Sequence, residues 1–138
     1  VFNMQNDNIK SALKLDNLFF DEISFSRIGF QNENKPKLSM EISIGEDINS
    51  KHYRTTLKFT LNKEDEYIVN VTAIGIFEFI GNVDEETKKD LIQKNSVSIM
   101  MPYVRSEISL ITAQPGVETV VLPPFNINNM INKGTKEN

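Results

Sequence analysis

The sequence contains no cysteine and only one histidine, His52. Without cysteine there can be no disulfide, no thiolate metal ligand and no cysteine nucleophile, and this absence fits a reducing compartment such as the cytoplasm. A single histidine cannot form a multi-histidine metal site within one chain. His52 stands beside a turn at the start of an expected strand, where we expect it to be exposed and inert. The sequence therefore predicts neither a metal nor a cofactor.

Long apolar runs and an excess of basic charge are also absent. No run of about 18 apolar residues occurs, so no membrane insertion is predicted, and residues 1–10 lack the pattern of a signal peptide. The formal net charge of -4 at pH 7 argues against nucleic acid and favours a basic electrostatic partner. With 138 residues, the chain is predicted to be one soluble, cytoplasmic domain whose ends, residues 1–8 and 133–138, are flexible tails.

Catalytic motifs are missing too. No serine lies in a G-x-S-x-G sequence, and no group of glycines has the spacing of a phosphate-binding loop. The acidic run Glu64-Asp65-Glu66 lacks the spacing of a calcium loop and is predicted to be a solvated hairpin turn. Arg105 and Glu107 lie in a predicted helix, where they form either a buried pair or part of its polar outer face. We therefore expect no enzymatic activity.

Alternation of apolar and polar residues is the main signal that the chain does carry. It predicts four half-buried strands, the first within residues 9–30 with its clearest alternation at 23–28, and the others at residues 38–44, 53–61 and 67–73. A break in the alternation at Phe19-Phe20-Asp21 predicts a β-bulge in the first strand. The polar residues 62–66 predict a hairpin, so the strands on either side of it should pair antiparallel.

The fourth strand continues to residue 80 and, from residue 73 onward, is apolar on both faces apart from Glu78. A strand of this kind must be covered on both sides. A four-stranded meander with about two helices covers only one face of its sheet. We therefore expect the other face to meet another subunit.

Two helices are predicted after the strands. Asp84, followed by two glutamates, predicts the cap and acidic first turn of a short helix in which Leu91 and Ile92 are buried. A longer helix is expected from near Ser96, with Pro102 either kinking it or marking its true first turn. Its buried stripe is predicted to consist of Val97, Met100, Met101, Val104, Ile108 and Ile111.

The sequence Gln114-Pro115-Gly116 predicts the end of the longer helix, because proline disfavours a helical predecessor and glycine accepts a positive φ. Residues 119–125 then predict an extended crossing segment closed by two prolines. Asn126 is expected to cap a last short helix with Met130 and Ile131 on its apolar side. Strands first and helices last predict an α+β fold, with a four-stranded antiparallel sheet followed by a long helix and a short C-terminal helix.

The order of these motifs and the residues within them resemble the SecB family of bacterial export chaperones over about residues 13–131. The most specific part is Met101-Pro102-Tyr103 with Arg105 and Ser109, followed by Leu122-Pro123-Pro124-Phe125-Asn126. Residues 13–25 are similar to the first strand of the family, and Gly75-Ile76-Phe77 is similar to the fourth.

The resemblance implies an ATP-independent holdase that binds unfolded polypeptide in apolar grooves. Its clients would be preproteins for export or, as in the SecB-like proteins that are dedicated to antitoxins, one antitoxin. It also implies a homotetramer, a dimer of dimers with the long helices between two sheets. By matching position, the implied client-binding residues are Leu38, Met40, Ile42, Leu122, Phe125, Met130 and Ile131.

Two positions depart from the family pattern. Asp21 and Glu22 match part of the acidic face that docks the SecA motor, but Ser26 stands where an acid is expected. Asn34 replaces a tryptophan of the family, so one aromatic wall of the groove is missing. These departures affect the implied export role more than they affect client binding.

The alternative reading is a small-molecule-binding or enzymatic α+β domain, with a pocket between the long helix and the sheet. A deep closed cavity with convergent polar groups would support that alternative, whereas an open apolar groove would count against it. A third possibility is a SecB-like fold that serves only as an assembly module.

Overall fold

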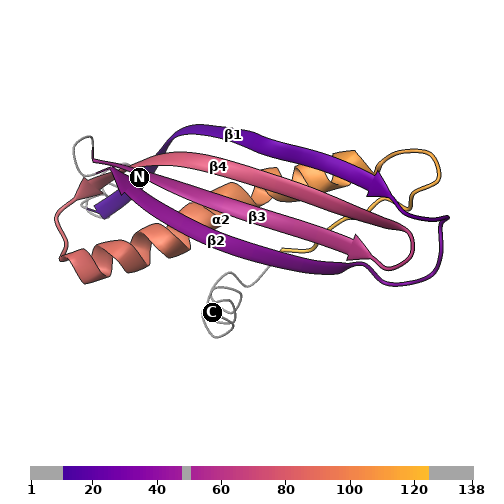
Figure 1. Cartoon of the computed structure of the whole chain (residues 1–138). Coiled ribbons are helices and arrows are strands. Elements are labelled where there is room, and N and C mark those ends of the chain that lie inside the picture. The colour runs from indigo at the N-terminus through magenta and orange to yellow at the C-terminus, as the bar shows by residue number, and fades with distance from the viewer. Residues whose placement is uncertain (1–10, 48–50, 125–138) are drawn as a thin grey trace, which may run out of the picture.

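The computed structural model describes residues 11–47 and 51–124. In this part of the chain, four strands precede one long helix: β1 (Ser11–Arg27), β2 (Lys37–Asp47), β3 (His52–Lys63), β4 (Tyr67–Gly81) and α2 (Glu85–Thr112). Figure 1 shows the strands in one elongated sheet, with α2 crossing a single face of it diagonally. The predicted α+β fold is confirmed, while the short helix expected around Met130 lies outside the described residues.

The strands are antiparallel and lie in the order β1-β4-β3-β2. The expected meander is therefore wrong, because β1 pairs with β4 and residues 28–36 carry the chain across the end of the sheet to β2. Periodicity in the sequence shows which side chains share a face, but it does not show which strands are neighbours. Among the described strands, this order leaves β1 and β2 as the two edges of the sheet.

β1 is 17 residues long and is bent at two places. The pairing with β4 shifts between Phe20 and Glu22, which confirms the bulge predicted at Asp21. A second shift lies between Leu15 and Asn17 and was not predicted. Because each bulge adds one unpaired residue, the apolar side chains of β1 return to the helix side after each interruption.

The 28 residues of α2 form one continuous helix. The prediction of two helices is wrong, because no glycine or proline interrupts residues 85–101. Asp84 caps the helix as predicted, its carboxylate accepting a hydrogen bond of 2.9 Å from the Thr87 N–H. Ser96, the expected start of the second helix, is buried in mid-helix, where its hydroxyl accepts a bond of 2.9 Å from Thr55 on β3.

Pro102 lies inside α2 rather than in its first turn. A proline there cannot donate to the carbonyl four residues earlier, which belongs to Ser98. Both residues are exposed, so water can reach the carbonyl that the proline leaves unpaired. This exposure explains how the helix tolerates the proline.

The core lies between α2 and the helix-facing side of β3 and β4. The predicted stripe of α2 is confirmed, with five of its six members buried and Ile111 half-buried. Leu91 is half-buried, whereas Ile92 is fully buried. The buried side chains that meet this stripe from the sheet are Tyr53, Leu57, Phe59, Leu61, Tyr67, Val69, Val71, Ala73 and Phe77.

The second face of β4 carries Ile74, whose side chain is only 2% exposed although no helix covers it in the described chain. Its cross-strand partners are Phe19 on β1 and Thr56 on β3. Such neighbours shield a side chain at the centre of a curved sheet. The burial of Ile74 therefore does not require another subunit, contrary to the argument made from the sequence.

Replacing Gly75 with alanine tests how tightly α2 packs on the sheet. A β-carbon at this position would lie 2.6 Å from the Phe77 ring and 2.8 Å from the Met100 sulfur. We expect Gly75→Ala to lower the free energy of unfolding by about 1–3 kcal/mol, because overpacking forces neighbours to move. Gly45→Ala is the control, because no atom lies within 4 Å of the added carbon. Equal urea midpoints for the two variants would contradict this packing.

Candidate functional site

A row of apolar side chains on β2 lies beside the core but beyond the helix. Leu38, Met40 and Ile42 are half-buried and pack against the edge of the core. Their partners on β3 are Leu61, Phe59 and Leu57, which are all buried. α2 packs mainly on β4, β1 and β3, and Figure 1 shows it running away from β2 towards the opposite edge. The apolar row, defined as these three residues, is therefore not covered by α2, the helix of the described chain.

A second apolar wall comes from the return segment, residues 117–124. The last turn of α2 ends with the Ala113 N–H donating to the Leu110 carbonyl, and Gly116, at φ 80°, turns the chain back as predicted. Thr112 then accepts a bond of 2.8 Å from the Val120 N–H. Ser109 donates a bond of 2.9 Å to the carbonyl of the same valine. The return segment is thus fixed to the side of α2 as an extended chain.

Arg105 fixes the far end of the return segment. Its Nε and Nη2 atoms donate to the Leu122 carbonyl at 3.1 and 2.9 Å. Leu122 is half-buried and packs against the core. Arg105 makes no ion pair with Glu107 in the described structure, so the two do not form a buried pair. Because Arg105 bonds to the return segment, it is also more than part of a polar outer face of the helix. Its role is to hold main chain in place.

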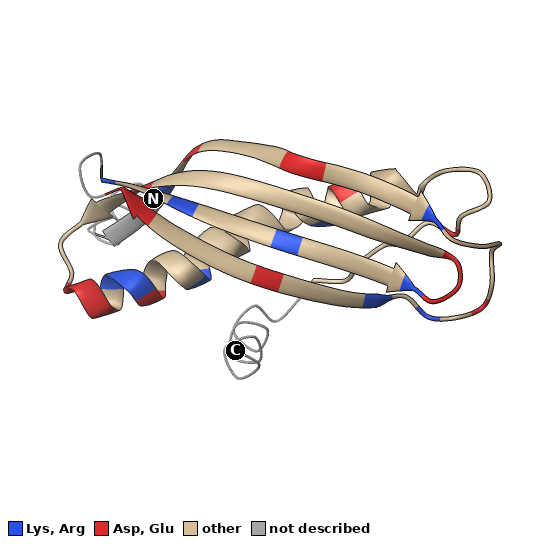
Figure 2. Ribbon diagram, in the orientation of Figure 1, with Lys and Arg blue, Asp and Glu red and all other residues tan. Residues whose placement is uncertain are grey.

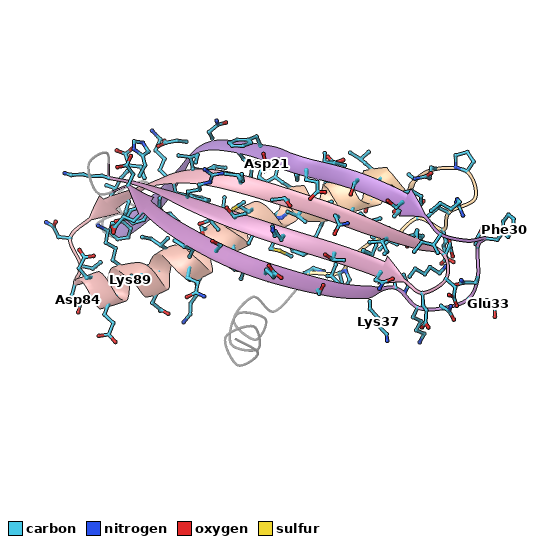
Figure 3. The ribbon with its side chains drawn as sticks, viewed as in Figure 1. Asp21, Phe30, Glu33, Lys37, Asp84 and Lys89 are labelled. Atoms are coloured by element: carbon cyan, nitrogen blue, oxygen red, sulfur yellow. The ribbon has the colours of Figure 1, made fainter. Side chains whose placement is uncertain are left out.

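Residues 28–36 form a loop that is tied to the hairpin between β3 and β4. The Ile28 and Gly29 N–H groups donate to the Glu66 carbonyl at 2.7 and 3.1 Å. The side-chain amides of Asn32 and Asn34 donate to the Glu64 carbonyl at 3.0 and 2.9 Å. Figure 3 shows Phe30 and Glu33 at the outer end of this loop. Asn34, at the position where the resemblance implies a tryptophan, therefore fastens the loop instead of supplying an aromatic surface.

Glu66 is completely buried, so the prediction of a fully solvated acidic turn is wrong for this residue. Its Oε1 atom lies 2.8 Å from the Lys63 ammonium and accepts a bond of 3.0 Å from the Asn32 N–H. Burial opposes ionisation, but the Lys63 and Asn32 hydrogen bonds outweigh it and lower the pKa of Glu66 below its ordinary value. Lys63 also donates to the Asn32 carbonyl at 2.9 Å. A buried ion pair therefore anchors the loop.

The opposite face of the sheet carries Asp21 and Glu22, the residues matched to motor docking. Both are exposed, and Asp21 occupies the bulge of β1. One row across the four paired strands contains, in order, Glu22 on β1, Thr72 on β4, Lys58 on β3 and Glu41 on β2. Figure 2 shows this alternation of acid, base and acid across the sheet. This face has mixed charge in the described structure.

A cavity between α2 and the sheet bears on the alternative of a small-molecule pocket. It has a volume of about 240 Å³ and lies between the first turns of α2 and the ends of β2 and β3, below the roughly 300–1,000 Å³ of typical ligand pockets. Lys88 lines it, with its ammonium 5.2 Å from the centre of the Tyr53 ring. Burial is the main cause that raises the pKa of Tyr53, so the hydroxyl stays protonated at neutral pH. This cavity gives no support to a catalytic role.

His52 is half-exposed rather than fully exposed, and its Nε2 atom lies 3.2 Å from a carboxylate oxygen of Asp16. Within residues 11–47 and 51–124, no cluster of three or more acidic or histidine side chains is placed to hold a metal ion. The same residues include no helix with the length and hydrophobicity of a membrane span.

The family can be assigned from the match to known sequences. A family model described as "Preprotein translocase subunit SecB" matches residues 6–138. The chain belongs to the SecB family. This confirms the resemblance drawn from the proline-containing helix and the segment that follows it.

The chain is also similar to individual proteins. An uncharacterized protein of Methanocaldococcus jannaschii is 29% identical, over 88% of this chain and 84% of that protein. The protein-export protein SecB of Alcanivorax borkumensis is 26% identical, over 88% of this chain and 85% of that protein. A Mycobacterium tuberculosis SecB-like chaperone, solved with a ChAD peptide from the HigA1 antitoxin, matches with a TM-score of 0.70. That match covers 82% of this chain and 90% of the other at 12% identity, so it shows the fold.

The structure places four of the seven residues matched to client binding in SecB proteins. Leu38, Met40 and Ile42 share one side of β2, and Leu122 lies on the return segment. Phe125, Met130 and Ile131 lie outside the described residues. The ion pair between Lys63 and Glu66 was not predicted from the sequence. It could have been suspected, because the two opposite charges are three residues apart across a tight turn.

Proposed function

We propose that this SecB-family protein is an ATP-independent holdase that binds unfolded polypeptide between the apolar row and the return segment. The observation that carries this proposal is the apolar row, three half-buried side chains beside the core that no helix of residues 11–47 and 51–124 covers. The return segment, fixed by Arg105 and Ser109, supplies a second apolar surface through Val120 and Leu122. Family membership and the fold shared with a SecB-like chaperone support the same role.

The proposed mechanism uses two interactions that do not depend on client sequence. Burial of apolar client side chains contributes roughly 25 cal/mol for each Å² removed from water. In addition, β2 is an edge strand of the described sheet, and an edge strand can pair through its backbone with an extended client. Neither interaction requires nucleotide hydrolysis, so release follows from reversible binding or from folding of the client.

The proposal includes assembly into a homotetramer in the cytoplasm. α2 carries further apolar residues beside its buried stripe. Ile99 is half-buried and packs against the edge of the core, whereas Tyr103 and Leu110 are 50% and 66% exposed. Residues separated by four and seven positions lie along one side of a helix. In the proposed tetramer, this surface packs against the same helix of another copy.

The proposed clients are unfolded preproteins or an antitoxin. The mixed charge of the outer sheet face, with Lys58 between Glu22 and Glu41, gives less support to docking of the SecA motor. The net charge of -4 favours basic unfolded segments in either case.

Ile42→Asp tests the proposed binding surface. We expect it to weaken binding of a permanently unfolded chain, reduced and amidomethylated ribonuclease A, by about tenfold, because an apolar contact is replaced by a charge. Ser43→Asp is the matched control, since it adds the same charge to the neighbouring exposed position of β2. Fluorescence anisotropy gives both dissociation constants. The same loss of affinity in both variants, or no loss in either, would contradict the proposed surface.

A further inference from the structure

The end of β1 lies close to both walls of the proposed binding surface. Figure 1 shows the loop that leaves β1 and the turn that follows α2 at the same end of the sheet. A cavity of about 740 Å³ separates residues 31–36 of this loop from the return segment. Side-chain packing across the cavity therefore does not fix the distance between the loop and the return segment.

Arg27, the last residue of β1, connects the two at one end of this cavity. Its Nη1 atom donates to the Gly29 carbonyl at 2.8 Å, and its Nη2 atom donates to the Gly116 carbonyl at 3.2 Å. A guanidinium group suits two such acceptors because it presents its donors in a fixed planar fork. Within residues 11–47 and 51–124, Arg27 is the one side chain that donates hydrogen bonds to both the loop and the chain after α2.

The two carbonyls that accept from Arg27 belong to main chain that is itself held in place. A β-carbon at Gly29 would collide with the Asp65 carbonyl, so the loop lies directly against the hairpin between β3 and β4. Gly116, at φ 80°, is followed by Val117, whose side chain is only 9% exposed and belongs to the core. Arg27 therefore joins two anchored pieces of main chain.

The Arg27 side chain is oriented by Phe25. The two residues are alternate members of β1 and so lie on one face of the strand. The guanidinium carbon is 5.9 Å from the centre of the Phe25 ring, within the range of a cation–π interaction. The Phe25 ring is in turn 5.2 Å from the ring of Tyr67, which is buried. This stack restricts the directions that an otherwise exposed side chain can take.

We propose that Arg27 is a positioning residue that sets the spacing between the two walls of the client-binding surface. The loop continues into β2, which begins at Lys37 and carries the apolar row, and Gly116 turns the chain into the return segment. Fixing both walls before a client arrives reduces the entropy that binding must remove. The inference rests on the proposed function and adds to it a residue that acts from outside the binding surface.

Two spin labels measure this spacing directly. The chain has no cysteine, so labels can be attached specifically at Glu33→Cys and Thr119→Cys, two exposed positions on opposite sides of the cavity. Dilution with unlabelled protein restricts double electron–electron resonance to distances within one chain. We expect one narrow distance distribution with Arg27 present and a broader one in Arg27→Met, because both hydrogen bonds are lost.

The same variants, without labels, are tested for binding of amidomethylated ribonuclease A by fluorescence anisotropy. We expect Arg27→Met to weaken binding by about fivefold, a modest loss because water competes for exposed hydrogen bonds. Arg27→Lys keeps the charge but not the planar fork, so it should broaden the distance distribution and weaken binding as well. It also provides the measurement if Arg27→Met does not fold.

Lys35→Met is the matched control, because it removes an exposed cation of the same loop that lines the cavity. It should change neither the distance distribution nor the affinity. An unchanged distribution in both Arg27 variants, or a broader distribution with unchanged affinity, would overturn the role of Arg27. Equal effects of Lys35→Met would also overturn it, since charge alone would then explain the result. If the protein with Arg27 intact binds no client, the proposed function fails, while the spin-label distances still decide whether Arg27 joins the two walls.

Discussion

Replacing Glu66 with glutamine is expected to lower the free energy of unfolding by about 3 kcal/mol, because removing one partner of a buried ion pair leaves the other charge uncompensated. The partner here is Lys63, whose ammonium is 2.8 Å from Glu66 and whose side chain is only 5% exposed. The substitution also weakens the bond to the Asn32 N–H and so loosens the loop between β1 and β2. Urea denaturation at fixed protein concentration measures the effect.

Glu64→Gln is the control for Glu66→Gln, since Glu64 is exposed on the same turn. It should change the free energy of unfolding by less than about 0.5 kcal/mol. Losses of equal size in the two variants would show that the turn as a whole, and not the buried pair, determines stability.

The contribution of Glu66 should depend on pH in a defined direction. Because its pKa is lower in the folded protein than the ordinary value of 4.5, folding favours the ionised carboxylate. The stabilisation is therefore complete above the unfolded pKa and is lost as pH falls through the folded pKa. The difference in stability between the wild type and Glu66→Gln should shrink on acidification from neutral pH. A difference that stays constant across that window would contradict the ion pair.

Arg105→Met is expected to weaken binding of unfolded polypeptide by about thirtyfold. The substitution keeps the length and much of the apolar stem but removes both hydrogen bonds to the Leu122 carbonyl. Hydrogen bonds from a charged donor contribute about 1.5–3 kcal/mol, and about 2 kcal/mol corresponds to thirtyfold in affinity. The return segment would then spend much of its time detached from α2. Anisotropy with amidomethylated ribonuclease A measures the loss.

Two observations make the Arg105 prediction specific. Hydrogen exchange of the Val120 amide should accelerate in Arg105→Met, because detachment of the segment exposes the bond to Thr112. Arg54→Met, at an exposed position of β3, should change neither exchange at Val120 nor client affinity. Unchanged affinity in Arg105→Met, despite faster exchange, would exclude the return segment from the binding surface.

Local features of the fold were predictable because they depend on periodicity within short stretches. The alternation around Met40 and the stripe around Met100 determine which side chains face the core. Asp84 and Gly116 mark the ends of the helical region through capping and positive φ. The pairing of β1 with β4 could not be predicted in this way, because it depends on contacts between residues far apart in sequence.

The candidate site was predictable only in part for the same reason. The apolar row follows from alternation, and Arg105 was noticed as part of a motif. Its bond to Leu122, however, depends on how the chain returns after α2. The burial of Glu66 depends on the loop between β1 and β2 folding over the hairpin, with Asp65 at φ 63° turning the chain beside it. An acidic run in the sequence does not show which of its members turns inward.

Native mass spectrometry of the protein, alone and with amidomethylated ribonuclease A, tests the central claim most directly. The proposed function predicts a homotetramer that takes up an unfolded client chain without nucleotide, and a reduced uptake in Ile42→Asp. A monomer, dimer or tetramer that stays free of client at every client concentration would contradict the account.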